Sequence, residues 1–234
     1  MSLTRVNNIT SNLTVDGVVT TTSVGTNLTS NSYNILTVQT DKDDTGSADG
    51  ILQFTTGSSN TVKGEIRYDA SEAMFEIGQG DNQGHIIIDG SGRVTMPNQP
   101  YFRVTMKYLA SNAWNGTAQT LDSTGYWNNP TDNVGSHWSS STGKFTAPVA
   151  GKYLFTFNMR YDSFSGSYFH IDMRKNGGVQ TRSLKSEGGS YLMGDVSQII
   201  NMAANDYMDI RVFSIGDSSV VLNNDSFLSG MLIG

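Results

Sequence analysis

The stretch GKFTAPVAGKYLFTFNMRY, from Gly143 to Tyr161, decides the fold class. After Gly151 its side chains sort by parity: large apolar residues occupy the odd positions, and polar residues occupy the even ones except at Leu154. Because successive side chains of a strand point to opposite faces, this alternation predicts a strand with one buried face. Such a strand belongs to a β-sandwich or a β-barrel. The odd set is Tyr153, Phe155, Phe157, Met159 and Tyr161.

The same alternation recurs along residues 101–234. Apolar residues at 102, 104 and 106, at 169, 171 and 173, and at 208, 210 and 212 alternate mainly with charged or polar neighbours. This pattern is typical of an antiparallel fold with two packed sheets. The final FLSGMLIG stays apolar almost to the last residue, which predicts a central strand at the C-terminus. The fold class expected is therefore all-β, with a sandwich in residues 101–234.

Composition limits the classes of function. The chain of 234 residues has a net charge of -6, 15% charged residues and no cysteine. An acidic chain offers no positive field to nucleic acid, so we expect no nucleic-acid partner. The absence of cysteine excludes a disulfide scaffold and thiolate metal sites. No apolar run approaches the roughly 18 residues of a membrane span, and the N-terminus lacks an apolar signal segment, so we expect no membrane insertion.

Residues 41–100 predict short strands separated by turns. The turn sequences DTGSADG, TTGSSNT, GQGDNQG and DGSGR separate apolar stretches at 51–55, 64–68, 74–77, 85–88 and 94–96. Three successive isoleucines, 86–88, indicate burial on both faces of one strand, which a lone meander cannot provide. We therefore expect a β-rich shaft of intertwined copies of the chain.

Residues 1–40 contain only short β-branched patches, each too small to bury itself. Two interpretations remain open: a disordered linker, or an extended segment that is ordered only when identical chains wrap together. At the other end of the shaft, Pro97 and Pro100 mark a boundary, because proline lacks a backbone donor and holds its predecessor extended. The expected organisation is a linker at 1–40, a shaft at 41–100 and a head at 101–234.

Two phrases in the shaft resemble stretches of bacteriophage proteins. They are GEIRYDASEAMFEIG, residues 64–78, and DGSGRVTMPNQP, residues 89–100, and both are similar to stretches common in fibre and structural proteins of tailed bacteriophages. That resemblance implies a homotrimeric β-structured shaft that carries a distal head. It also implies a place in the virion as an exposed fibre, assembled in the host cytoplasm and joined to other virion proteins through its N-terminus.

The head resembles the jelly-roll superfamily of complement-one-q and tumour necrosis factor. An aromatic residue, Thr-Gly, an aromatic strand, proline, glycine and an aromatic pair follow one another in WSSSTGKFTAPVAGKYLF, and KNGG at 175–178 and the terminal FLSGMLIG continue the pattern. The resemblance implies a ten-strand jelly roll assembled as a compact homotrimer, with a β-rich shaft in place of a collagen repeat. The family-pattern residues are Trp138, Thr142, Gly143, Phe145, Pro148, Gly151, Tyr153, Phe155, Phe227 and Gly230.

In such a head both termini lie at the base, so connections after odd strands point to the apex. By that count the apical segments are 111–136, 162–167, 185–190 and 215–225. Aromatic side chains flanked by amides and carboxylates suit sugar or protein surfaces, because a ring face covers CH groups while polar neighbours bind hydroxyls. For Trp114 and Trp127, packing at the barrel mouth is the alternative to binding. The candidate receptor-binding residues are Trp114, Tyr126, Trp127, Phe164 and Tyr168.

The sequence predicts no catalytic residues, no metal site and no cofactor. Known nucleophile, zinc and phosphate-loop motifs are missing, and His85, His137 and His170 lie far apart in sequence. His170 and Asp172 share a strand face and are interpreted as a structural or subunit-facing pair. A metal held by three symmetry copies of His85 or His170 remains an alternative.

Two function classes follow. The first is a non-enzymatic trimeric phage fibre that attaches to a host cell-surface glycan or protein through apical loops, where three copies multiply weak contacts. The second is a structural virion fibre, such as a neck, whisker or decoration fibre, whose head serves as trimerisation nucleus. A third, a glycan depolymerase between subunits, would use shaft carboxylates such as Asp69, Glu72 or Glu76.

Overall fold

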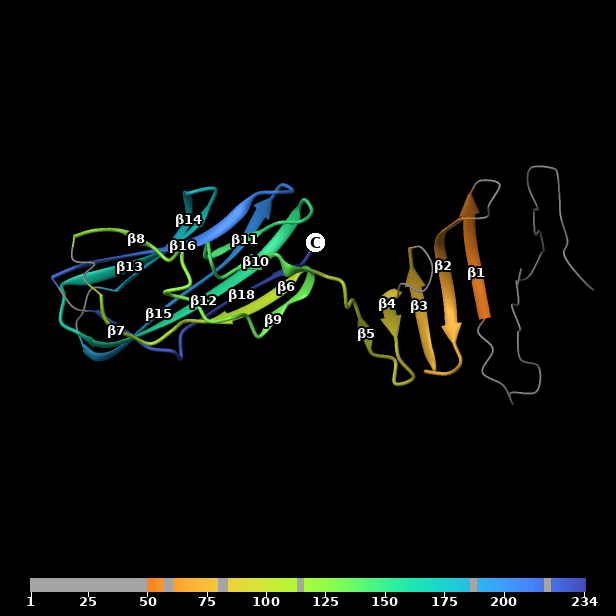
Figure 1. The fold of residues 1–234 in the computed structure, drawn as a ribbon, viewed down its shortest axis with the longest axis horizontal. Helices are drawn as coiled ribbons and strands as arrows, with labels where there is room; N and C mark the ends of the chain where they lie inside the picture. The colour runs from red at the N-terminus through yellow and green to blue at the C-terminus, as the bar shows by residue number, and fades with distance from the viewer. Residues whose placement is uncertain (1–49, 57–60, 80–83, 113–115, 186–188, 217–219) are drawn as a thin grey trace, which may run out of the picture.

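The computed structural model describes residues 50–56, 61–79, 84–112, 116–185, 189–216 and 220–234. Two parts follow one another along its long axis: a single sheet up to residue 95, and a two-layered head from residue 101 (Figure 1). The C-terminus lies at the end of the head that faces the single sheet. The segment 1–40 and Trp114 lie outside the described residues. Among those residues, no helix has the length and apolar character needed to span a membrane.

The single sheet, called the shaft sheet below, is an antiparallel meander in the order β1-β2-β3-β4-β5. Every one of its strands pairs with its sequence neighbours in the same chain. Short turns let neighbouring strands pair locally within one chain. The expected intertwining of several copies stays a prediction. Its strands, all foreseen to within three residues, are β1 (Gly50–Thr56), β2 (Thr61–Asp69), β3 (Met74–Gly78), β4 (Gly84–Ile88) and β5 (Val94–Thr95).

One layer of the head, called the β12 sheet, runs in the order β7-β17-β12-β18-β6-β9, and β15 pairs with the other edge of β12. The last strand, β18, lies between β12 and β6, which confirms the central position predicted for the C-terminus. The strands are β6 (Tyr101–Thr105), β7 (Leu109–Asn112), β9 (Asp132–Asn133), β12 (Gly151–Phe164), β15 (Gly189–Met202), β17 (Val220–Leu222) and β18 (Phe227–Leu232).

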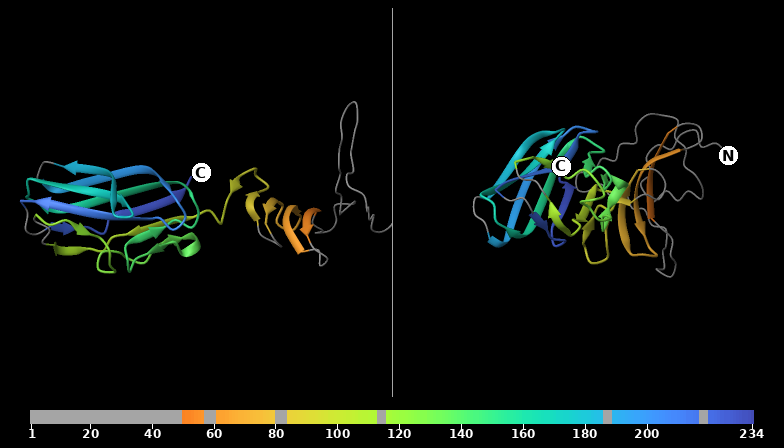
Figure 2. Two further views of the ribbon diagram at one scale, coloured as in Figure 1. Left: turned by 90° about the horizontal axis from the view of Figure 1, so that it is seen from above. Right: turned by 60° about the vertical axis from the view of Figure 1, so that its left-hand side comes forward.

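The second layer, called the β13 sheet, runs in the order β10-β11-β16-β13-β14, with β8 on β16. It packs on the β12 sheet as a jelly-roll sandwich (Figure 2). The described residues of the head form thirteen strands where ten were expected, and the three two-residue strands account for the difference. The strands are β8 (Gln119–Thr120), β10 (Trp138–Ser139), β11 (Lys144–Thr146), β13 (Tyr168–Lys175), β14 (Gly178–Lys185) and β16 (Tyr207–Ile215); a 3-10 turn, η1 (Val134–Ser136), precedes β10.

The core lies between these two layers. The odd residues of β12, from Tyr153 to Tyr161, are all at most 1% exposed, as their alternation predicted. Phe102 stacks between Trp138 and Phe145, with ring centroids 4.9 and 5.1 Å away. At Gly230, one of the family-pattern residues, a Cβ would lie within 2.6 Å of the rings of Phe155 and Phe102. The glycine therefore allows two aromatic rings to pack directly on the backbone.

The other pattern residues build the base. Gly151 leaves no room for a Cβ, which would lie 2.7 Å from Leu232. Tyr153 donates its hydroxyl proton to the carbonyl oxygen of Val149, beside Pro148, and so fixes the turn before β12. Phe227 differs from the rest: it is only partly buried, with the guanidinium of Arg103 5.3 Å from its ring centroid.

The connection between the shaft sheet and the head is held at both ends. Gln99 donates its side-chain amide to the carbonyl oxygen of Leu232, and the Leu232 amide donates to the carbonyl oxygen of Pro100. On the shaft side, Asn98 Nδ2 lies 3.2 Å from Nδ1 of His85. These bonds tie the linker to both parts.

Candidate functional site

Phe164 and Tyr168 lie at the end of the head that points away from the shaft sheet, where β12 ends and β13 begins. They differ in accessibility. Phe164 is 2% exposed, and its ring packs edge-on against Phe169 at 5.5 Å. Tyr168 is half-buried. Of this pair, only Tyr168 has surface that a ligand can touch.

Trp127 is part of the core. It is 1% exposed, its indole Nε1 donates to the carbonyl oxygen of Leu121 at 2.7 Å, and its ring meets Trp138 edge-on at 5.1 Å. Both the apolar ring and its polar atom are therefore satisfied inside the protein. Trp127 therefore has the packing role that the sequence left as the alternative to receptor binding. Its buried ring has no surface that a receptor could contact.

The segment 111–136 is not apical throughout. Residues 111 and 112 belong to β7, at the far end, but β9 pairs with residues 102 and 103 of β6, at the base. The chain therefore runs from apex to base within this one connection, which parity counting over long strands cannot foresee. Tyr126, midway along it, is half-buried, and this burial raises the pKa of its hydroxyl, with Asp122 adding to the effect.

A denser cluster lies on the outer face of the β13 sheet. Side chains of β13 alternate, so Phe169, Ile171 and Met173 enter the core while their even-numbered neighbours point outward. Cross-strand pairing places β14 residues on one side of this row and β16 residues on the other. The resulting set, called the outer-face cluster, is Tyr168, His170, Asp172, Arg182, Leu184, Arg211 and Phe213.

Asp172 is the centre of the charges. It is fully buried, and it lies directly opposite Arg182 on β14 and Arg211 on β16. Its Oδ1 accepts from Arg182 Nε at 2.6 Å, and its Oδ2 accepts from the Arg211 guanidinium at 2.6 Å. Burial pushes the pKa of Asp172 upward, but the bonds from Arg182 and Arg211 outweigh it and hold the pKa below the usual range. With one carboxylate and two guanidinium groups, this triad carries a net positive charge in an acidic chain.

Aromatic rings continue the outer-face cluster toward the apex. His170 stacks on Phe213, with ring centroids 4.9 Å apart at 17°, and Tyr168 lies 6.3 Å from His170 at 20°. Leu184, the cross-strand partner of His170, is 58% exposed. The stacked rings and the leucine form a mainly apolar patch beside the two arginines.

A shallow pocket of about 330 Å³ opens over this surface, and Ser167, Tyr168, His170, Arg182 and Leu184 line it. Its lining combines the rings of Tyr168 and His170 with the guanidinium of Arg182 and the hydroxyl of Ser167. Aromatic rings cover the CH groups of a sugar or an apolar side chain, and Arg182 can donate to hydroxyl or carboxylate oxygens. The pocket therefore suits a surface glycan or a protein loop.

Protonation of His170 is expected to destabilise the head. Burial lowers the pKa of His170; Asp172 opposes this, while Arg182 and Arg211 add to it. The unfolded chain therefore binds this proton more tightly than the folded head does. The folded state loses stability as the pH falls below the pKa of about 6.5 that histidine has in the unfolded chain, and the loss continues down to the lower pKa of His170 in the folded head. The melting temperature should fall between pH 7.5 and 5.5, and His170→Gln should flatten that fall. An unchanged slope in the variant would contradict this role.

Two of the candidate shaft carboxylates, those of Asp69 and Glu76, are engaged in structural contacts. Asp69 accepts from the backbone and hydroxyl of Ser71 and from the backbone of Glu72; the bond from the Ser71 hydroxyl is the largest cause of its lowered pKa. Glu76 is buried in an ion pair with Arg67. A general acid needs a raised pKa, which Asp69 does not have. Within the described residues, no group of three or more His, Cys, Asp or Glu side chains is arranged to hold a metal ion.

Sequence reasoning found His170 and Asp172 on one strand face but missed Arg182, Arg211 and Phe213. These three lie on β14 and β16, ten or more residues away, and only strand register brings them to the pair. The alternation within β16 was visible in the sequence, yet no local signal shows which strands it pairs with.

The two-sheet sandwich with this strand order is a jelly roll. The C1q domain model matches residues 108–233, which is more than half of the chain. The chain therefore belongs to the C1q domain family.

Several solved structures are similar to part of the chain. The globular domain of zebrafish complement 1qA is 20% identical, with a TM-score of 0.47 over 58% of this chain and 98% of that one. Murine APRIL is 10% identical, with a TM-score of 0.45 over 58% and 99%. Eiger TNF from S. frugiperda is 11% identical, with a TM-score of 0.43 over 58% and 94%. No curated protein matches the chain.

Proposed function

We propose that the chain is the subunit of a non-enzymatic, homotrimeric bacteriophage fibre that attaches to a host cell-surface glycan or protein through the apical part of its head. Domains of the C1q family commonly form trimers and are typically binding or structural modules. The phage assignment rests on the resemblance of residues 64–78 and 89–100 to phage fibre sequences. In this proposal the fibre is exposed on the virion and is joined to it through the N-terminus.

The observation that carries the attachment role is the pocket over the outer-face cluster. Tyr168, His170 and Arg182 are among the residues that line it, and it lies in the half of the head that is distant from the shaft sheet. A shallow pocket gives weak binding by itself, but three copies on one fibre raise the effective concentration of the second and third contacts. This arrangement suits a repeated ligand such as a cell-surface polysaccharide.

The fluorescently labelled full-length chain, applied to intact bacterial cells and to polysaccharide purified from them, tests this role. Tyr168→Ala and Arg182→Gln should each weaken binding at least tenfold, about 1.4 kcal/mol, because each removes one contact of the pocket. Tyr108→Ala and Arg93→Gln are matched controls, since both residues are exposed outside the cluster. Equal binding by all four variants would place the receptor site elsewhere.

A structural fibre is the second candidate. The large exposed apolar residues of the shaft sheet, seven of which lie on one face, favour an assembly role for the chain independently of any receptor. If cells of every tested host ignore the labelled protein while it remains an oligomer, the structural role gains support. Light scattering at micromolar concentration should give three times the chain mass of 25.4 kDa in either case; a monomer would contradict both.

A further inference from the structure

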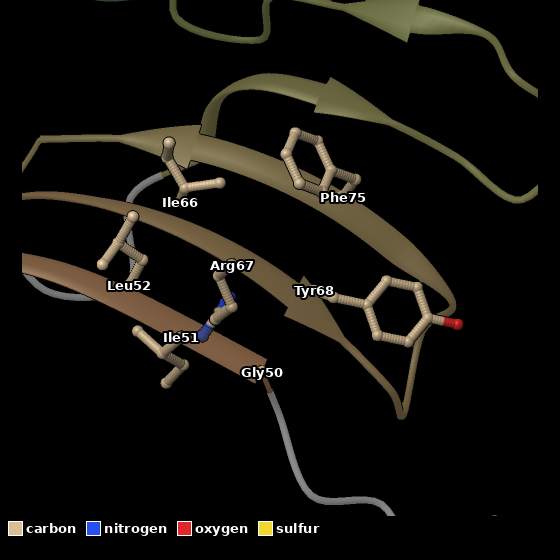
Figure 3. Close-up of a pocket in the computed structure, with 7 residues that line it drawn as sticks. All are labelled: Gly50, Ile51, Leu52, Ile66, Arg67, Tyr68 and Phe75. Atoms are coloured by element: carbon tan, nitrogen blue, oxygen red, sulfur yellow. The ribbon is translucent and has the colours of Figure 1, made fainter. Parts of the chain in front are cut away.

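The shaft sheet has two chemically different faces. Directly paired residues of antiparallel strands share a face, so the register reads each face across the sheet. One row joins Leu52, Ile66, Ile77 and Ile86, and the next joins Tyr68, Phe75, Ile88 and Val94. Figure 3 shows four of these residues, Leu52, Ile66, Tyr68 and Phe75, around a pocket that Ile51 and Arg67 of the opposite face also line. The apolar face is defined as Leu52, Phe54, Ile66, Tyr68, Phe75, Ile77, Ile86, Ile88 and Val94.

The opposite face is mainly polar. Arg67 lies across from Glu76 and donates to its carboxylate, and it also lies 3.5 Å from Asp69. Gln53 donates to Glu65 at 3.3 Å. These long polar side chains bond to one another across the strands, so this face can lie against water. Its apolar members include Ile51, Met74 and Ile87.

No described part of the same chain covers the apolar face. Seven of its nine residues are 37% to 61% exposed, and none of the nine carries a charge. A large apolar side chain has a surface on the order of 150 Å². Seven such side chains, each about half exposed, present roughly 500 Å² of apolar surface. That equals the largest apolar patch of a typical monomer, and it approaches the roughly 800 Å² that each partner buries in a stable interface.

The orientation of the face points to its occupant. The strands β1 to β5 lie across the long axis of the molecule and succeed one another along it, so the face extends along that axis (Figure 1). The linker at residues 96–100 is bonded to both the shaft sheet and the head. When heads assemble around an axis, the sheets of the same chains are therefore carried to that axis together.

We propose that the apolar face packs against the same face of two other copies of the chain, so that three shaft sheets enclose a common apolar core. This inference rests on the trimer of the proposed function but not on its attachment role. It replaces intertwined strands with three intact sheets placed side by side. The ion pairs of Arg67 then lie on the outside, and the successive isoleucines 86–88 supply the inner face with two residues and the outer face with one.

Single cysteine variants of the full chain test the proposal, because the native chain has no cysteine. Leu52→Cys places a thiol on the apolar face, and Ile51→Cys places one on the opposite face. The two native residues are adjacent and equally exposed, at 40% and 39%. In the native oligomer a maleimide should label the position 52 thiol at least tenfold more slowly than the position 51 thiol, and both should react equally fast in denaturant.

The outcomes separate the possibilities. Equal labelling rates in a trimer overturn the packed sheets but leave the trimeric head intact. Protection of position 52 in a monomer would mean that another part of the same chain covers the face, which also overturns the proposal. Protection in a trimer, whether or not the protein binds cells, supports it. If Leu52→Cys fails to fold, the pair Phe54→Cys and Gln53→Cys repeats the comparison one step along β1.

Discussion

Replacement of Gly143 by alanine is expected to abolish stable folding of the head. The residue has a φ of 60°, and a Cβ there would lie 1.8 Å from the carbonyl oxygen of Leu121 and 2.9 Å from Nε1 of Trp127. These two atoms are hydrogen-bonded to each other, so the new carbon would have to break a buried bond as well as displace backbone. We expect a loss of more than about 4 kcal/mol, measured by urea unfolding of the full chain.

Gly116→Ala is the matched control for this substitution. Gly116 has a similar φ of 71°, but a Cβ there meets no atom within 4 Å. Its cost should be that of the backbone conformation alone, about 1 to 2 kcal/mol. Equal losses of unfolding free energy at the two positions would show that glycine is needed at position 143 for its backbone angle and not for lack of space.

Replacement of Trp127 by alanine should lower the free energy of unfolding by about 3 to 5 kcal/mol, the usual cost of deleting a buried large aromatic side chain. The substitution empties a site between Trp138 and Phe157 and leaves the buried carbonyl of Leu121 without its donor. Thermal and urea unfolding followed by circular dichroism would measure the loss.

Tyr108→Ala, at a residue that is 57% exposed, should cost less than 1 kcal/mol in the same assay. If Trp127→Ala proved as stable as this control yet failed to bind cells, Trp127 would return to the receptor site. The structure leads us to expect the reverse, so binding experiments on the head should not use this position.

The strands and their parity could be predicted because they depend on local chemistry. In β12 the odd residues are buried as their alternation required, and the turn glycines of the shaft separate strands where expected. Candidate site residues were harder to predict. Tyr168 lies at the pocket, whereas Trp127 and Phe164 are core residues, because an aromatic side chain near a loop has the same appearance in sequence whether it packs inward or outward.

By itself, the sequence determined the all-β class, the boundary near Pro100, the buried face of β12 and the family pattern around Gly143. Each of these follows from side-chain alternation and from residues with special backbone requirements, which act within a few positions of the chain. Only the tertiary structure showed which strands pair. That pairing put Arg182 and Arg211 on Asp172 and gathered the apolar side chains of five shaft strands on one face. Register between distant strands is a property of the folded sheet, and no single stretch of sequence contains it.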